Sequence, residues 1–180
     1  MRLFHLSLGA NLGAREASLA QAVRRIANAG LAIDRVSSLY ETEPVGDLAG
    51  PRWFLNLAVS GRTALPAREI VGVGLEIERA MGRARDAAGG ARSIDIDLLL
   101  LEELIVREAG CEVPHPRMHE RRFVLDPLAE IAPEARHPVL AMTVRELQER
   151  LQDPACVLKR GPLIVHGGSH ASHRPLRAGV

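Results

Sequence analysis

The segment from Arg92 to Leu101 constrains the fold of this chain more than any other stretch. Apolar residues alternate with Ser93, Asp95 and Asp97, and an unbroken run of leucines follows. This pattern is typical of a β-strand whose second half is buried on both faces. Because side chains repeat every two residues along a strand, Asp95 and Asp97 should project from the same side, about 7 Å apart.

Two carboxylates on one side of a core strand repel each other unless a positive group lies between them. Magnesium suits this position, because it is commonly bound by one or two carboxylates together with substrate phosphates. Arg83, Arg85 and Arg92 precede the strand, and a guanidinium group matches the geometry of phosphate. The acids and arginines together indicate phosphoryl-group chemistry. The alternative is a solvated Asp-x-Asp face that pairs with arginine and has no catalytic role.

Composition narrows the class of protein. A length of 180 residues predicts one domain with a substantial core, and a net charge of +1 favours neither a nucleic-acid surface nor a membrane patch. The two cysteines, Cys111 and Cys156, form no disulfide framework, so we expect a reduced, cytoplasmic setting. The apolar start is too short for a signal peptide, and no run approaches membrane-spanning length. We expect a monomer that binds small molecules.

Apolar periodicity and turn residues predict the order of the elements. We expect strands at 3–8, 31–40, 53–63, 92–101 and 104–106, with a glycine-flanked turn at 9–13 and long loops at 41–52 and 83–91. Helices are predicted through Leu19 to about Gly30, from Pro66 to Met81, around 123–125, and from the capping box Thr143–Glu146 to about Leu151.

The order β-α-β-β-α-β predicts an α+β fold of the ferredoxin-like type with C-terminal additions. Its antiparallel sheet would carry helices on one face and leave the other face for loops and ligand. We expect a catalytic domain over residues 1–160 and a disordered tail over 161–180, which is rich in Gly, Ser, His, Pro and Arg. The alternative for His166, His170 and His173 in this tail is metal binding.

Other phosphate-binding signatures are missing from the sequence. No glycine-rich stretch ends in Gly-Lys-Ser/Thr, and neither the protein-kinase motifs nor a nucleophile elbow is present. An enzyme that uses a nucleotide here would therefore hold the phosphates with arginine and metal.

Several sequence blocks, in collinear order over residues 3–151, resemble 6-hydroxymethyl-7,8-dihydropterin pyrophosphokinase, a family of the folate pathway. Each block is weak alone, but the ordered set is specific. The blocks are Leu8–Gly13, Tyr40–Gly46, Phe54–Asn56, Ile77–Glu78, Gly82–Arg85, Arg92–Asp97 and Val113–His115, with Arg121 and Phe123.

The resemblance implies an enzyme that transfers pyrophosphate from ATP to the pterin hydroxymethyl group and releases AMP. It implies that Asp95 and Asp97 hold two Mg²⁺ ions and that Arg83 and Arg92 neutralise charge in the transition state. The residues that match its nucleotide positions are Glu78, Arg85, Leu98, His115 and Arg121. The residues that match its pterin positions are Thr42, Val45, Phe54, Asn56 and Phe123, with the two aromatic rings enclosing the pterin.

The chain departs from the family pattern mainly at the nucleotide. The loop before the aspartate strand lacks the family's tryptophan and proline, and it reads Gly89-Gly90-Ala91-Arg92. Leu75, Gly110, Glu112 and Pro116 stand where the family has glutamine, arginine, threonine and an aromatic residue. These departures leave a second hypothesis open, a catalytically weak pterin- or nucleotide-binding module on the same fold. A metal-dependent nuclease that uses Asp-x-Asp is disfavoured because the chain lacks a basic surface.

Overall fold

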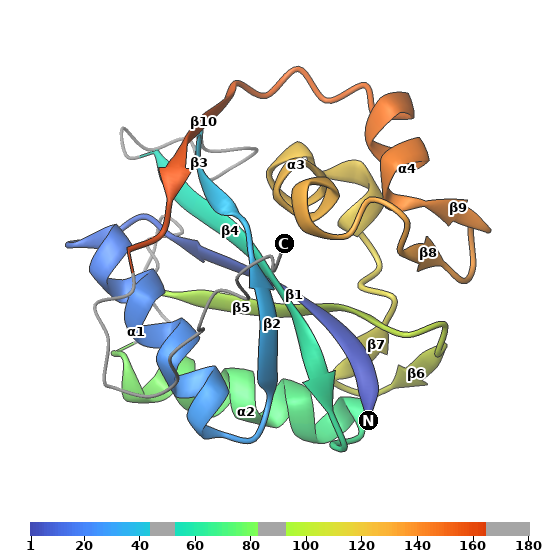
Figure 1. Cartoon of the computed structure of the whole chain (residues 1–180), viewed down its shortest axis with the longest axis horizontal. Coiled ribbons are helices and arrows are strands. Elements are labelled where there is room, and N and C mark those ends of the chain that lie inside the picture. Colours follow the sequence, from blue (N-terminus) through green and yellow to red (C-terminus); the bar gives the residue numbers. More distant parts are fainter. Residues whose placement is uncertain (44–52, 83–92, 165–180) are drawn as a thin grey trace, which may run out of the picture.

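In the computed structural model, residues 1–43, 53–82 and 93–164 are described (Figure 1). They form an antiparallel sheet with helices on both faces. The main strands are β1 (Arg2–Ala10), β2 (Ala32–Val36), β3 (Ser38–Thr42), β4 (Phe54–Thr63), β5 (Asp95–Leu101) and β10 (Val157–Pro162). Short strand pairs are β6 (Val106–Glu108) with β7 (Cys111–Val113) and β8 (Arg136–His137) with β9 (Met142–Thr143). The helices are α1 (Arg15–Asn28), α2 (Ala67–Ala80), α3 (Arg122–Ile131) and α4 (Val144–Arg150), with a 3₁₀ turn at Met118–Glu120.

The strand order places β1 between β4 and β5. The order is β10-β3-β4-β1-β5, with β2 also paired to β4. Both neighbours of β1 run antiparallel to it. Within the described residues β5 is therefore an edge of this path, and its two aspartates begin that edge strand.

The hydrophobic core has two layers, one on each face of the sheet. Alternate residues of β1, including Phe4, Leu6 and Leu8, pack against α1 and α2. On the opposite face, Leu99 and Leu100 pack against α3 and α4. The register between β1 and β5 shifts next to Leu99, since His5 pairs with Leu100 but Leu6 pairs with Leu98. This irregularity places the consecutive residues Leu99 and Leu100 on the same face, while Leu98 and Leu101 lie in the other core layer. The leucine run is thus buried on both faces, as predicted.

The prediction of helices on only one face is wrong. Figure 1 shows α1 and α2 on one side of the sheet and α3 on the other. The predicted short helix at 123–125 is the ten-residue α3, which continues through Pro127 to Ile131. A proline inside a helix removes one backbone hydrogen bond. Burial of Val124, Leu125 and Leu128 against the sheet favours the helix despite that loss.

Several strand boundaries also differ from the prediction. The predicted strand 31–40 is two strands, because Ser37 interrupts the ladder: its backbone N–H donates to Ala58 O, and its hydroxyl accepts from the Ala58 N–H. Gly9 lies in β1 and Thr42 in β3, where a turn and a loop were expected. Leu104 and Ile105 precede β6. The unpredicted β10 includes Gly161 and Pro162, and residues 165–180 lie outside the described residues.

The described residues contain no helix that is both long and apolar enough to cross a membrane.

His5 makes the stability of the fold sensitive to acid. Its side chain is buried beside the Ser60 hydroxyl, with 2.7 Å between Nδ1 and Oγ, and burial lowers the pKa of His5 to about 4. The unfolded chain, with an ordinary histidine pKa near 6.5, therefore binds more protons than the folded chain between pH 4 and 6.5. Stability should fall as pH decreases through this interval.

We expect His5→Asn to flatten this pH dependence. In the unmodified chain, the free energy of unfolding in urea should be lower at pH 5.0 than at pH 7.5, and His5 should account for about 2 kcal/mol of the difference. The His5 contribution should disappear in the variant. The variant retains a polar group that can bond to Ser60. Equal slopes of stability against pH in the two proteins would contradict this account.

Candidate active site

The strand register brings the predicted pterin and metal residues into one row across the sheet. Asn56 on β4 pairs with Gly9 on β1, and Gly9 pairs with Asp95 on β5. Ser7 pairs with Asp97 in the next row. Since neighbouring strands are about 4.8 Å apart, the Cα atoms of Asn56 and Asp95 are separated by roughly 10 Å. A site built on this row has an amide at one end and carboxylates at the other.

Gly9 allows Asn56 to lie across the middle of this row. A Cβ atom added at Gly9 would be 2.6 Å from Asn56 Oδ1, well inside contact distance. Asn56 Nδ2 donates a 2.7 Å hydrogen bond to Thr42 Oγ1, and both residues are buried. Thr42 therefore fixes the amide that was predicted to recognise pterin, and it does so with its side chain.

The carboxylates of Asp95 and Asp97 start from the same face of β5, and both residues are half-buried. They share this face with Asn56, because the three residues occupy non-core positions next to Gly9 and Ser7. Two carboxylates at a strand edge leave coordination positions for water or phosphate oxygens. Among residues 1–43, 53–82 and 93–164, no group of three or more His, Cys, Asp or Glu side chains could hold a metal ion.

A side chain of α2 bonds to the backbone at the start of β5. Glu78 Oε1 accepts a 2.7 Å hydrogen bond from the Ile96 backbone N–H, and Glu78 is only 2% exposed. A buried carboxylate is costly unless it accepts hydrogen bonds, so this contact fixes the strand between the two aspartates. The Leu98 side chain packs in the core against α1 and α2. A contact between Leu98 and a nucleotide would therefore come from its backbone.

His115 and Arg121 lie near the carboxylate end. The His115 backbone N–H donates to Leu99 O at 2.9 Å, which attaches this residue to β5. Burial, followed by the charges of Arg121 and Arg117, lowers the pKa of His115, while Asp95 acts in the opposite direction. The imidazole therefore stays neutral at pH 7. Its Nδ1 accepts a 3.2 Å hydrogen bond from the Arg117 backbone N–H, which leaves Nε2–H as a donor.

The two predicted aromatic residues, Phe54 and Phe123, come from different elements. Phe54 begins β4, two residues before Asn56 and on the same face. Phe123 lies in the first turn of α3, on the sheet face opposite α1 and α2, and the Arg121 guanidinium carbon is 5.5 Å from its ring centroid. Four predicted site residues, Val45, Arg83, Arg85 and Arg92, lie outside the described residues.

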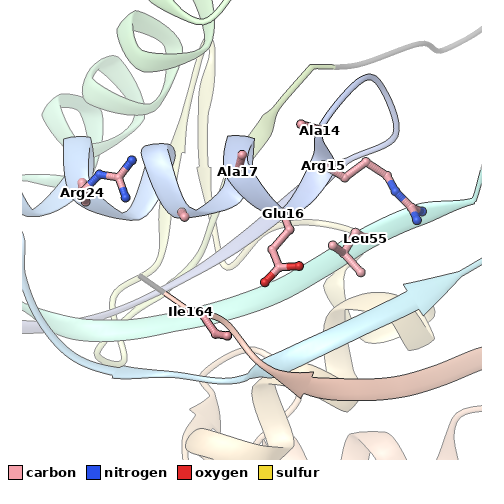
Figure 2. A pocket seen from close by; sticks show the side chains of 8 residues that line it. Ala14, Arg15, Glu16, Ala17, Arg24, Leu55 and Ile164 are labelled. Carbon is pink, nitrogen blue, oxygen red and sulfur yellow. The ribbon is translucent and has the colours of Figure 1, made fainter. Parts of the chain in front are cut away.

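A separate hollow of about 710 Å³ lies on the other face of the sheet. Figure 2 shows it between α1, Leu55 of β4 and Ile164, with the Glu16 side chain pointing into it. Leu55 faces the α1 layer of the core, whereas its neighbour Asn56 faces the opposite side. Of the predicted site residues that the structure describes, none lines this hollow.

Comparison with known families shows which family the chain belongs to. The sequence profile of the 7,8-dihydro-6-hydroxymethylpterin-pyrophosphokinase family matches residues 5–133. The chain belongs to this family. The match confirms the predicted resemblance and includes every residue of the row from Asn56 to Asp95.

Curated relatives of the family support the match over most of the chain. The chain is 43% identical to "2-amino-4-hydroxy-6-hydroxymethyldihydropteridine pyrophosphokinase" of Bacillus subtilis over 128 residues, which are 71% of this chain and 76% of that protein. It is 42% identical to the protein of the same name from Methylorubrum extorquens over 152 residues, 84% of this chain and 94% of that one.

Solved structures support the fold. A Plasmodium falciparum HPPK-DHPS crystal structure with pteroate has a TM-score of 0.65 at 16% identity, and the match covers 83% of this chain and 44% of that one. The chain thus spans less than half the length of this longer protein. The likeness confirms an α+β domain with an antiparallel sheet.

The sequence analysis included Gly9 and Tyr40 in the family blocks but gave neither residue a role. Gly9 was assigned to a turn because it begins a glycine-flanked segment. A glycine at the end of an apolar alternation also indicates a close approach of another group to the backbone, and here that group is Asn56. No short-range signal indicated that Tyr40 contacts Glu130, which is 90 residues away in the sequence.

We expect Asn56→Ala to weaken pterin binding by roughly 1–3 kcal/mol, because the ring edge loses hydrogen-bond partners in a largely dry site. ATP affinity measured without pterin should change little, since Asn56 lies at the other end of the row. Calorimetric titration with each ligand checks this. Equal weakening for both ligands would assign Asn56 a structural role and contradict the placement of the pterin.

Proposed function

We propose that this chain transfers the pyrophosphoryl group of ATP to the hydroxyl of 6-hydroxymethyl-7,8-dihydropterin, with release of AMP, on the row formed by Asn56, Gly9 and Asp95. The activity is that of the family, a step of folate biosynthesis. The observation that carries the assignment to this row is the register, in which Gly9 separates the amide from the carboxylate. One substrate can then bind at each end, with the reacting groups between them.

The pterin binds at the amide end. Asn56, held by Thr42, recognises the polar edge of the ring with its donor and acceptor atoms. Phe54 and Phe123 enclose the flat faces of the ring. Val45 contributes a further contact from the segment that follows β3. Stacking and edge recognition together orient the hydroxymethyl group along the row toward β5.

The nucleotide binds at the carboxylate end. Its triphosphate lies against Asp95 and Asp97, with Arg83 and Arg92 on the phosphates. Arg85, His115, Arg121 and the Leu98 backbone form the remainder of the nucleotide site. His115 fits this role because Nδ1 of its neutral ring accepts from Arg117, so Nε2–H can donate to a nucleotide acceptor. Glu78 supports the site through its hydrogen bond to the Ile96 backbone N–H.

The residues present fit a magnesium site. Two half-buried carboxylates on one strand face supply hard oxygen ligands, and water and phosphate oxygens can complete the coordination. Mg²⁺, in the two-ion arrangement that the resemblance implies, would draw charge from the attacking and leaving oxygens when bound. The chain's own contribution is to hold Asp95 and Asp97 rigidly, through the Glu78 bond to the β5 backbone.

The reaction follows from this arrangement. The pterin hydroxyl oxygen attacks the β-phosphorus of ATP, and the bond from that phosphorus to the oxygen bridging to the α-phosphate breaks. AMP leaves, and the β- and γ-phosphates remain on the pterin. Holding both substrates in line supplies much of the rate increase, because it removes the entropic cost of their encounter.

A catalytically weak binding module is the second candidate, favoured by the departures at the nucleotide positions. The structure adds one observation: Gly110, in the turn between β6 and β7, has φ of +77°, a conformation unfavourable for arginine. An arginine at this position would therefore be strained in the backbone that this chain adopts.

Product analysis separates the two candidates. The purified chain is incubated with ATP, Mg²⁺ and 6-hydroxymethyl-7,8-dihydropterin, and AMP is measured by chromatography. The enzyme should release AMP over many turnovers only when all three are present. Binding of both ligands without AMP release would support the binding module and contradict the proposed enzyme.

A further inference from the structure

One carboxylate at the end of α3 collects hydrogen bonds from a single strand. Glu130 accepts from Tyr40 Oη at 2.8 Å, from Ser38 Oγ at 2.8 Å, and from the Ser38 backbone N–H at 3.2 Å. Lys159 Nζ of β10 lies 3.4 Å from the same carboxylate. Burial opposes ionisation of Glu130, but the hydrogen bonds from Tyr40 and Ser38 outweigh it and lower the pKa of Glu130.

The same strand also supports the pterin end of the site. Ser38, Tyr40 and Thr42 alternate along β3 and therefore share a face. Thr42 holds the Asn56 amide, and Tyr40 pairs with Asn56 in the register. Tyr40 is only 8% exposed, so its hydroxyl depends on Glu130 in place of water. β3 is thus connected to Asn56 at one end and to α3 at the other.

Glu130 and Phe123 occupy opposite ends of one side of α3. They are seven residues apart, which is nearly two helical turns and about 10 Å along the axis. A shift of the Glu130 end therefore moves Phe123 relative to β4. Because stacking depends on ring geometry, a displacement of about 1 Å is sufficient to weaken it.

We infer that the Tyr40–Glu130 hydrogen bond sets the position of α3 so that Phe123 stacks correctly on the pterin bound at Asn56. Tyr40 and Glu130 are positioning residues, since they act through Phe123. The inference rests on the proposed placement of pterin at the amide end of the row. The inference adds to the pterin site a contact between two residues that are 90 positions apart in the sequence. This contact joins β3 to α3.

Tyr40→Phe removes only the hydroxyl and leaves Ser38 and Lys159 beside Glu130. We expect pterin affinity, measured by calorimetry with Mg²⁺ and a nonhydrolysable ATP analogue, to fall 3- to 10-fold. Affinity for the ATP analogue alone should change less than twofold. Glu130→Gln retains an acceptor oxygen and should lose less pterin affinity than Glu130→Ala. Glu134→Gln, which alters an exposed ion pair with Arg145 beyond α3, is the matched control and should match the unmodified chain.

A double-mutant cycle separates positioning from general stability. In a Phe123→Ala background, Tyr40→Phe should cause less than 1.5-fold further loss of pterin affinity, because its effect passes through Phe123. An undiminished effect in that background, or unchanged pterin affinity in Tyr40→Phe itself, would overturn the inference. Circular dichroism and urea unfolding establish that each variant is folded under the titration conditions.

The same variants distinguish a failure of the proposed pterin site from a failure of the positioning role. If Asn56→Ala and Phe123→Ala both leave pterin affinity unchanged, the pterin site is misplaced, and the inference falls with it. If both weaken binding while Tyr40→Phe does not, the proposed site stands and only the positioning role is overturned.

Discussion

Asp97→Asn should reduce magnesium-dependent AMP release on the order of 10³-fold, because it removes a charge that holds the metal against the triphosphate. Pterin binding should persist, since the amide end of the row is unaltered. The fold should also persist, because Asp97 is half-buried beside Ser7 and outside the core clusters. Relief of repulsion from Asp95 should leave stability equal or slightly higher.

Steady-state AMP release and urea unfolding check this result. Asp34→Asn is the matched control, because Asp34 is another strand aspartate, and its side chain is 51% exposed beside Arg62. The control should retain activity within twofold. A rate for Asp97→Asn close to that of the unmodified chain would remove Asp97 from the metal site.

Gly9→Val should lower pterin affinity roughly 100-fold or more. The new Cβ would be 2.6 Å from Asn56 Oδ1, so the amide must leave its position and its bond to Thr42. Loss of the amide contacts and steric crowding each contribute about 1–3 kcal/mol. The strand itself should tolerate valine, which favours extended backbone.

Calorimetry with pterin, Mg²⁺ and an ATP analogue measures this effect. Gly72→Val in α2 is the matched control, since no atom lies within 4 Å of a Cβ atom added there. The control should bind pterin normally. Normal pterin affinity in Gly9→Val would contradict the close approach of Asn56 to β1 and the position of the site.

Strand periodicity was sufficient to predict that the Asp95 and Asp97 carboxylates lie on one face of their strand. The alternation before Leu98 assigned Asp95 and Asp97 to one face, and the leucine run predicted burial on both sides. The row itself was not predictable from local pattern. It depends on the register of β4, β1 and β5, in which residues far apart in the sequence become neighbours.

One helix was predicted too short and one strand was missed, each for a physical reason. Pro127 is a helix-breaking signal, so the pattern predicted only a short helix where α3 continues to Ile131. β10 contains Lys159, Arg160 and Gly161 without apolar alternation, and its pairing with β3 stabilises it. Tertiary contacts decided both elements. Because the full length of α3 was not predicted, the contact of Glu130 with Tyr40 of β3 was not recognised from the sequence.

The most direct test of the proposed activity follows the β-phosphate of ATP. The purified chain is incubated with Mg²⁺, 6-hydroxymethyl-7,8-dihydropterin and ATP carrying radioactive phosphorus at the β position. If the pterin oxygen attacks the β-phosphorus, the label should appear on the pterin and the released nucleotide should be unlabelled AMP. Labelled ADP as the product, or no label on the pterin, would contradict pyrophosphoryl transfer by this chain.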